Sequence, residues 1–76
     1  MHVSTLRQQR IERLWSQAEL ARRSGVAVRT IINIETGQRL PRLLTMRRIA
    51  GALEVEWTGI EEFRQAVKDL EEKVAA

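Results

Sequence analysis

Two glycines and a helix-capping pattern divide the first half of this chain into short helices. Ser16 suits the N-cap of a helix, and Glu19, three residues later, completes the capping-box pattern. Gly25 can take the left-handed conformation that ends a helix, and Gly37 supplies a second stop. The β-branched residues between the two glycines favour a strand by propensity, but the glycine stops and the flanking helical pattern outweigh that preference. The pattern predicts two helices joined by a tight turn, over 17–24 and about 28–36.

The remaining segments also have helical periodicity. Leu6, Arg10 and Leu14 recur at the spacing of one helix face, and Pro41 suits the start of a later helix. Because no strand-like alternation lasts more than a few residues, we expect an all-α fold, a compact bundle of five short helices. The further helices are expected over about 4–14, from Pro41 to about 53, and over about 58–74. The expected core residues of the middle helices are Val26, Ile31, Ile34, Met46, Ile49, Ala50 and Leu53.

The outward face of the expected helix over 28–36 carries residues suited to reading DNA bases. Arg29 and Asn33 lie one turn apart on this face, and their side chains can pair with the major-groove edges of guanine and adenine. Val28 and Ile32 lie on the same face, although a surface helix normally carries polar residues there. These two apolar residues could contact thymine methyl groups, meet a protein partner, or simply be tolerated.

Charge is distributed unevenly along the 76 residues. Residues 1–53 contain ten arginines and three acidic residues, which gives a net charge of +7. Residues 54–76 contain three basic and seven acidic residues, which gives −4. A basic body with an acidic tail indicates one part that binds a polyanion and another part with a different role.

The composition also bears on compartment and chemistry. The chain has no cysteine and no stretch apolar enough to span a membrane, so we expect a cytoplasmic protein that binds DNA in a prokaryotic-type nucleoid. His2 is the only histidine, tyrosine is absent, and no glycine-rich phosphate loop occurs. We therefore expect no enzymatic activity, no cofactor and no metal site.

A second group of residues is suited to holding DNA phosphates. The N-terminus of the expected helix over 17–24 offers unpaired backbone N–H groups, which favour an anion. Ser16 and Gln17 lie at that end, and Arg39 and Arg42 follow the outward-facing helix. Such contacts would position the protein on DNA without reading its sequence.

From Leu6 to Val55, about two thirds of the chain, the sequence resembles the phage repressor and Cro class (XRE-type) of helix-turn-helix domains. The matching residues occur in the right order and spacing. They are Arg10, Ser16-Gln17-x-x-Leu20-Ala21, Gly25-Val26, Ile31, Ile34-Glu35-x-Gly37, Pro41, Thr45-Met46 and Ile49-Ala50-x-x-Leu53-x-Val55.

The resemblance implies a lambda-repressor-like fold with its helix-turn-helix at about 16–36 and the second of these helices in the major groove. It also implies a structural ion pair between Arg10 and Glu35. Two positions depart from the family pattern. Ala27 stands where a serine or threonine usually caps the recognition helix, and Leu14 stands where the family often has glycine.

The last segment has the pattern of a helix that meets another helix. Its apolar residues follow alternating three- and four-residue spacing among charged ones: Ile60, Phe63, Val67, Leu70 and Val74. We expect Trp57, Ile60 and Phe63 to pack on the domain, whereas little of the domain remains to be covered beyond Phe63. Val67, Leu70 and Val74 then require another partner, for which a homodimer is favoured over docking on the same chain or a frayed tail. This divides the chain into a DNA-binding core over 1–57 and a C-terminal amphipathic helix over 58–76.

Taken together, these features favour a transcriptional repressor that binds double-stranded DNA as a homodimer on an inverted repeat. The alternative is a module whose main partner is a protein, either the antitoxin of a toxin–antitoxin pair or a coactivator-like bridging domain. In the bridging case Val28 and Ile32 would form the protein-contact face.

Overall fold

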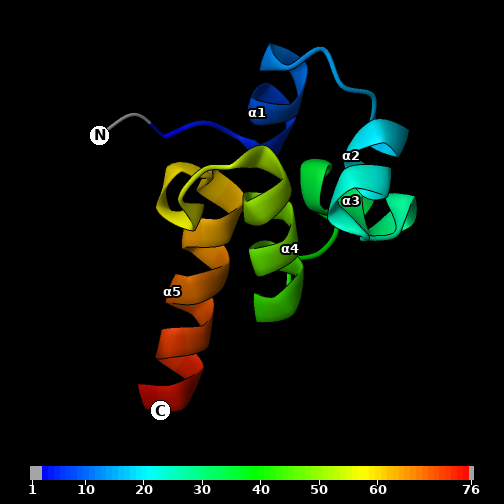
Figure 1. Cartoon of the computed structure of the whole chain (residues 1–76). Helices are drawn as coiled ribbons and strands as arrows, with labels where there is room; N and C mark the ends of the chain where they lie inside the picture. Colours follow the sequence, from blue (N-terminus) through cyan, green and yellow to red (C-terminus); the bar gives the residue numbers. More distant parts are fainter. Residues whose placement is uncertain (1–2, 76) are drawn as a thin grey trace.

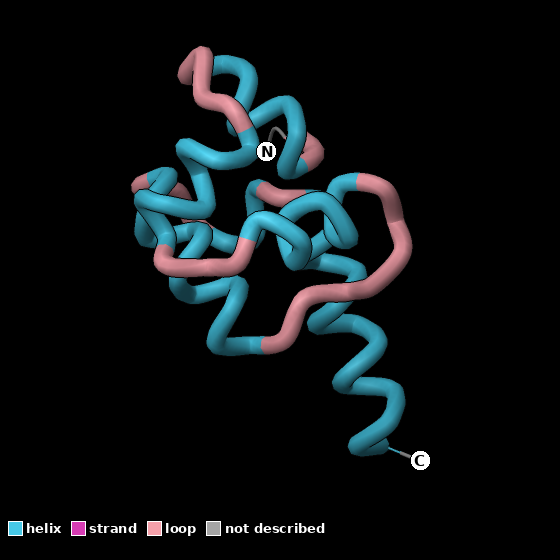
Figure 2. The backbone as a smooth tube through the Cα atoms, turned by 90° about the vertical axis from the view of Figure 1, so that its right-hand side faces the viewer, coloured by secondary structure: helices cyan, strands magenta, loops and turns pink. Residues whose placement is uncertain are grey.

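The computed structural model describes residues 3–75, and within them the fold is all-α. Five helices follow one another in a compact arrangement (Figure 1). They are α1 (Leu6–Glu12), α2 (Gln17–Ser24), α3 (Val28–Glu35), α4 (Leu43–Leu53) and α5 (Glu61–Ala75), with a single 3-10 turn at Trp57–Gly59 before α5. Loops without regular secondary structure join the helices (Figure 2), and helices that are not consecutive in sequence also pack together, as α1 does with α3 and α2 with α4.

The first two helices start at side-chain caps. The Ser16 hydroxyl accepts a hydrogen bond from the Glu19 N–H at 3.0 Å, and Gly25 ends α2 with φ 71°. Helix α1 is shorter than the expected 4–14, because Thr5 caps it in a full capping box with Gln8 and it stops at Glu12. Leu14 lies beyond that end with φ 58° and is 92% exposed, so the expectation that it extends the face of α1 is wrong. The left-handed conformation at Leu14 explains why glycine suits this position.

The later helices differ from expectation mainly at their starts. Helix α3 has Ala27 as its N-cap, with no side-chain hydrogen bond to the first turn. Helix α4 begins at Leu43 and not at Pro41, because Arg42 is the extended N-cap residue and Pro41 is buried in the segment before it. Helix α5 begins at Glu61, after the 3-10 turn, and not at residue 58.

One hydrophobic core joins all five helices. The expected core residues of the middle helices are confirmed as buried, and Ile31 and Ile49 are completely inaccessible to solvent. Helix α2 packs against both α3 and α4, and the first half of α5 covers the other side of α4. The buried apolar residues are Leu6, Leu20, Val26, Ile31, Ile34, Met46, Ile49, Ala50, Leu53, Ile60, Phe63 and Ala66.

Backbone contacts tie the start of α5 to the start of the chain. The Ser4 N–H donates to the Gly59 carbonyl at 2.9 Å, and the Glu61 N–H donates to the Ser4 carbonyl at 2.8 Å. The Glu62 carboxylate accepts a hydrogen bond from the Leu6 N–H, also at 2.8 Å. The first turn of α5 is therefore fixed to the first turn of α1.

The second half of α5 extends past the N-terminal end of α4 (Figure 1). The expectation that the domain covers α5 only as far as Phe63 is wrong. Ala66 is buried, and Val67 is partly buried against the core. Leu70 is 41% exposed and Val74 is 80% exposed. Within residues 3–75, every helix is too short or too polar to span a lipid bilayer.

Candidate nucleic-acid interface

Helix α3 presents a mixed polar and apolar face away from the core. Ile31 and Ile34 point into the core, with 0% and 1% exposure. On the outward side Arg29 is exposed, Val28 is 42% exposed, and Ile32 and Asn33 are partly exposed. The four residues predicted to read bases therefore share one accessible face of one helix.

The C-terminal half of α3 lies beside two exposed arginines. Gly37 has φ 77°, and the chain then turns back so that the N–H groups of Gln38 and Arg39 donate to the Asn33 carbonyl at 2.8 and 3.2 Å. This turn brings Arg39 and Arg42 to the rim of a recess of about 250 Å³ next to α3. The recess is lined by Thr30, Asn33, Ile34, Arg39, Leu40, Pro41, Arg42 and Thr45.

The N-terminus of α2 approaches the C-terminal end of α3. Ser16 is exposed at the cap, and the Gln17 side-chain amide donates to Glu35 Oε1 at 3.2 Å. Gln17 is thus held against the recognition helix, beside the unpaired N–H groups of the first turn of α2. The capping box is only half formed, because the Glu19 carboxylate pairs with Arg22 and Arg23 instead of returning to the Ser16 N–H.

A buried ion pair fixes the orientation of α3. The Arg10 Nε donates to Glu35 Oε2 at 2.7 Å, and Nη2 donates to Oε1 at 2.9 Å. Arg10 Nη1 also donates to the Trp15 carbonyl at 2.8 Å. The side chains of Arg10 and Glu35 are only 10% and 2% exposed, and the hydrogen bond to Glu35 raises the pKa of Arg10. The pair implied by the resemblance is present, and it links α1, the α1–α2 loop and the end of α3.

The family model described as HTH_3: Helix-turn-helix matches residues 6–60, from the first residue of α1 to the start of α5. The chain belongs to the HTH_3 family. This is the Cro/C1-type, or XRE, class, so the resemblance and the lambda-repressor-like fold are confirmed. Membership makes DNA the partner and places the chain in a non-enzymatic family. No curated protein and no solved structure matches the chain.

The HTH_3 domain also contains a side-chain cluster that the sequence analysis missed. The Arg23 guanidinium lies 4.3 Å from the centre of the Trp15 ring, and Arg13 approaches the same ring at 5.9 Å. Arg13 Nη2 donates to the Leu53 carbonyl at 2.8 Å, at the C-terminus of α4. Two arginines of the basic half, Arg13 and Arg23, therefore have structural contacts within the domain. The sequence spacing of these residues gives no signal of these contacts, which become apparent only in the folded structure.

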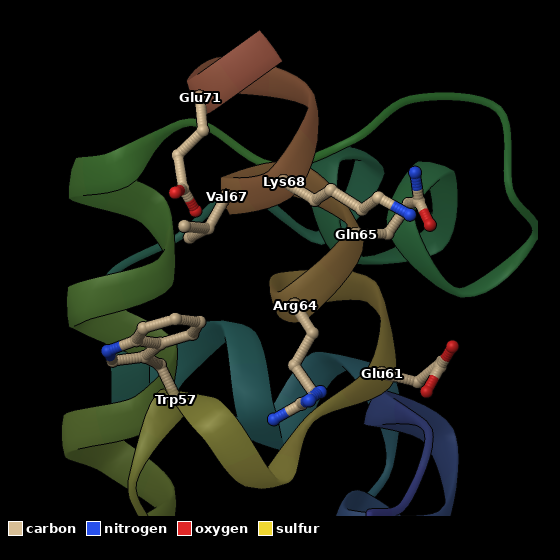
Figure 3. Close-up of a pocket in the computed structure, with 7 residues that line it drawn as sticks. All are labelled: Trp57, Glu61, Arg64, Gln65, Val67, Lys68 and Glu71. Atoms are coloured by element: carbon tan, nitrogen blue, oxygen red, sulfur yellow. The ribbon is translucent and has the colours of Figure 1, made fainter.

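Beyond the residues matched by the family model, the predicted dimerisation residues on α5 occupy different surroundings. Val67 lines a groove of about 340 Å³ beside Trp57, together with Arg64 and Glu71 on α5 (Figure 3). Leu70 lies in a second recess, of about 430 Å³, with Leu40, Leu43 and Met46. Val74 is exposed beyond both. The three residues thus lie along one helix, and only Val67 has substantial cover from its own domain.

Proposed function

We propose that this chain is a sequence-specific regulator of transcription, most simply a repressor, that reads double-stranded DNA through α3. The observation that carries the proposal is the outward face of α3, where Arg29 and Asn33 lie one turn apart beside Arg39 and Arg42. A helix of this kind fits the major groove, and its position on the domain is held by the Arg10–Glu35 pair.

In this proposal Arg29 and Asn33 supply base specificity. Arginine can donate two hydrogen bonds to guanine O6 and N7, and asparagine can pair with adenine N6 and N7. Each good pair discriminates against a wrong base by about 1–3 kcal/mol. The exposed Arg29 side chain is free to extend into the groove, since no described residue pairs with it.

Phosphate contacts on both sides of α3 would hold the helix in register. Ser16 and Gln17 lie at the N-terminus of α2, where the hydroxyl, the amide and the free backbone N–H groups can donate to one phosphate. Arg39 and Arg42 line a recess beside the C-terminal half of α3, from which they would reach a second phosphate. Because these contacts carry no sequence information, they position the base-reading residues.

The proposal includes a homodimer formed through the end of α5. Leu70 and Val74 are exposed there, and Leu40 and Leu43 add apolar surface beside Leu70. Charges of both signs border this surface, including the Lys73–Asp69 ion pair, so two copies related by a two-fold axis can match opposite charges. A symmetric dimer places two recognition helices about 34 Å apart on an inverted repeat. Occupation of promoter DNA would then repress transcription without any chemical step.

A second candidate is an antitoxin, in which the same exposed apolar surface binds a toxin. The observation that favours it is that Leu70 and Val74 of this surface lie on α5, in the acidic part of the chain. A chain that stays monomeric and still binds its operator with high affinity would favour this candidate over the dimeric repressor.

Two arginine variants separate base reading from phosphate binding. On the preferred operator, Arg29→Ala should lower affinity by about 1–3 kcal/mol and relax the preference at one base pair. Arg39→Ala should instead weaken binding to all sequences and reduce the slope of log affinity against log salt by about one. Fluorescence anisotropy across a salt series measures both. Equal losses on all sequences for Arg29→Ala would contradict the proposed role of α3.

A further inference from the structure

The outward face of α3 consists of two parallel rows, one apolar and one polar. Val28 and Ile32 form the apolar row, and Arg29 and Asn33 form the polar row. Within each row the two residues are four positions apart, which is a separation of about 6 Å along the helix axis. That distance is close to two base-pair steps of about 3.4 Å each.

The apolar row is not needed by the core of the domain. Ile31 and Ile34 already supply the buried side of α3, while Val28 is 42% exposed and Ile32 is partly exposed. The row lies on the helix that carries Arg29, and the phosphate-binding candidates Gln17 and Arg39 both contact the C-terminal part of that helix. If α3 enters the major groove, Val28 and Ile32 enter with it and face base edges.

We propose that this apolar row recognises the C5-methyl groups of pyrimidines in the major groove. The inference rests on the proposed function and specifies its target. The C5-methyl group is the one apolar feature that bases present in this groove. Thymine always carries it, and cytosine carries it when it is methylated at C5.

The two rows together assign the methyl groups to particular base pairs. Val28 and Arg29 are adjacent along the helix, as are Ile32 and Asn33, so each level offers one apolar and one polar side chain. At an A·T pair, Asn33 faces the adenine and Ile32 faces the thymine methyl. At a G·C pair, Arg29 faces the guanine and Val28 faces C5 of the cytosine. Methylation of that cytosine fills the space beside Val28 and should strengthen binding.

Three duplexes of the preferred operator test this inference. The first is unmodified, the second has uracil in place of the thymine opposite the adenine read by Asn33, and the third has 5-methylcytosine opposite the guanine read by Arg29. Burial of one methyl group predicts about fourfold weaker binding to the second duplex and about fourfold tighter binding to the third. If affinity changes only for the second duplex, the recognised methyl group is that of thymine. If affinity changes only for the third duplex, it is that of methylated cytosine.

Equal affinities for all three duplexes would overturn the inference while leaving the proposed function intact. The absence of any preferred operator would overturn both. Val28→Ala provides the variant test, since Val28 is exposed and its truncation should preserve the fold. It should bind the first and third duplexes equally. The matched Leu44→Ala variant, at an exposed apolar residue of α4, should still bind the third duplex more tightly than the first. If both variants bind the first and third duplexes equally, the result would contradict a role specific to Val28.

Discussion

At the scale of single residues, Glu35 matters most to the position of the recognition helix. It accepts two hydrogen bonds from Arg10 and one from Gln17, and its side chain is almost fully buried. The raised pKa of Arg10 means that the stabilisation from its charge is fully present below the ordinary arginine pKa. This stabilisation is lost only as the pH rises through the raised pKa of the folded state. Arg10 therefore stays charged across the range in which the domain would be studied.

Removal of Glu35 should be costly, because it leaves the Arg10 charge buried without a partner. We expect Glu35→Ala to lower the free energy of unfolding by about 3 kcal/mol or more, as is typical of a broken buried pair. Urea denaturation followed by circular dichroism measures this loss. A change near zero would show that Arg10 and Glu35 do not fix α3.

The matched control is Glu19, which pairs with Arg22 and Arg23 on the surface of α2. Hydrogen bonds from Arg22 and then Arg23 lower the pKa of the Glu19 carboxyl. Its stabilisation is therefore present above the unfolded-state pKa and is lost as pH falls through the lowered folded-state value. Because solvent screens this pair, Glu19→Ala should change stability far less than Glu35→Ala.

At the scale of elements, α2 and α3 form a pair with unequal caps. Ser16 caps α2 through the Glu19 N–H, whereas Ala27 offers α3 no side-chain acceptor. The first turn of α3 thus keeps free N–H groups on the side that is proposed to enter the groove. This is the one helix start where sequence alone indicates a missing interaction, and the structure agrees.

Substitution of the two cap residues should move stability in opposite directions. Ala27→Ser should raise the free energy of unfolding by about 1 kcal/mol, because serine supplies the missing acceptor. Ser16→Ala should lower it by a similar amount for the reverse reason. Thermal and urea denaturation of the free protein measure both. A loss of stability in Ala27→Ser would mean that α3 begins differently from the structure.

Helix caps and periodicity in the sequence predicted the helices. The features that they did not predict are a local backbone conformation and contacts between residues far apart in the sequence. Ser16 and Gly25 set the bounds of α2 correctly, because caps and left-handed glycines act within one turn. Leu14 was assigned to α1 because its periodicity fits, and nothing local reveals its positive φ. The contact of Ser4 with the segment at Gly59, and the stacking of Arg23 on Trp15, depend on residues brought together only by the fold.

At the scale of the whole molecule, charge and apolar exposure separate two ends with different proposed roles. The basic half contains α3 and the arginines beside it, while the acidic part contains α5 and borders the exposed leucines. Val67 proved to be partly covered by its own domain, so the proposed dimer surface shifts toward Leu70 and Val74, together with Leu43.

Charges placed at the end of α5 should therefore separate the copies. The double variant Leu70→Lys with Val74→Lys should be monomeric at concentrations where the proposed wild-type dimer forms, as measured by sedimentation equilibrium. Affinity for a full inverted repeat should fall at least about tenfold while affinity for a half-site is unchanged. Leu14→Lys, also at an exposed leucine, is the control and should leave the dimer intact. A double variant that remains dimeric would exclude this surface.

The central claim, that α3 reads DNA sequence as part of a dimer, is tested most directly by selecting bound duplexes from a randomised library. The selection is run at about 150 mM salt so that non-specific phosphate attraction is weakened. The account predicts an enriched inverted repeat with half-site centres about 10 base pairs apart. Each half-site should contain guanine and adenine at the positions that Arg29 and Asn33 contact. Salt-sensitive binding without any enriched sequence would contradict the account.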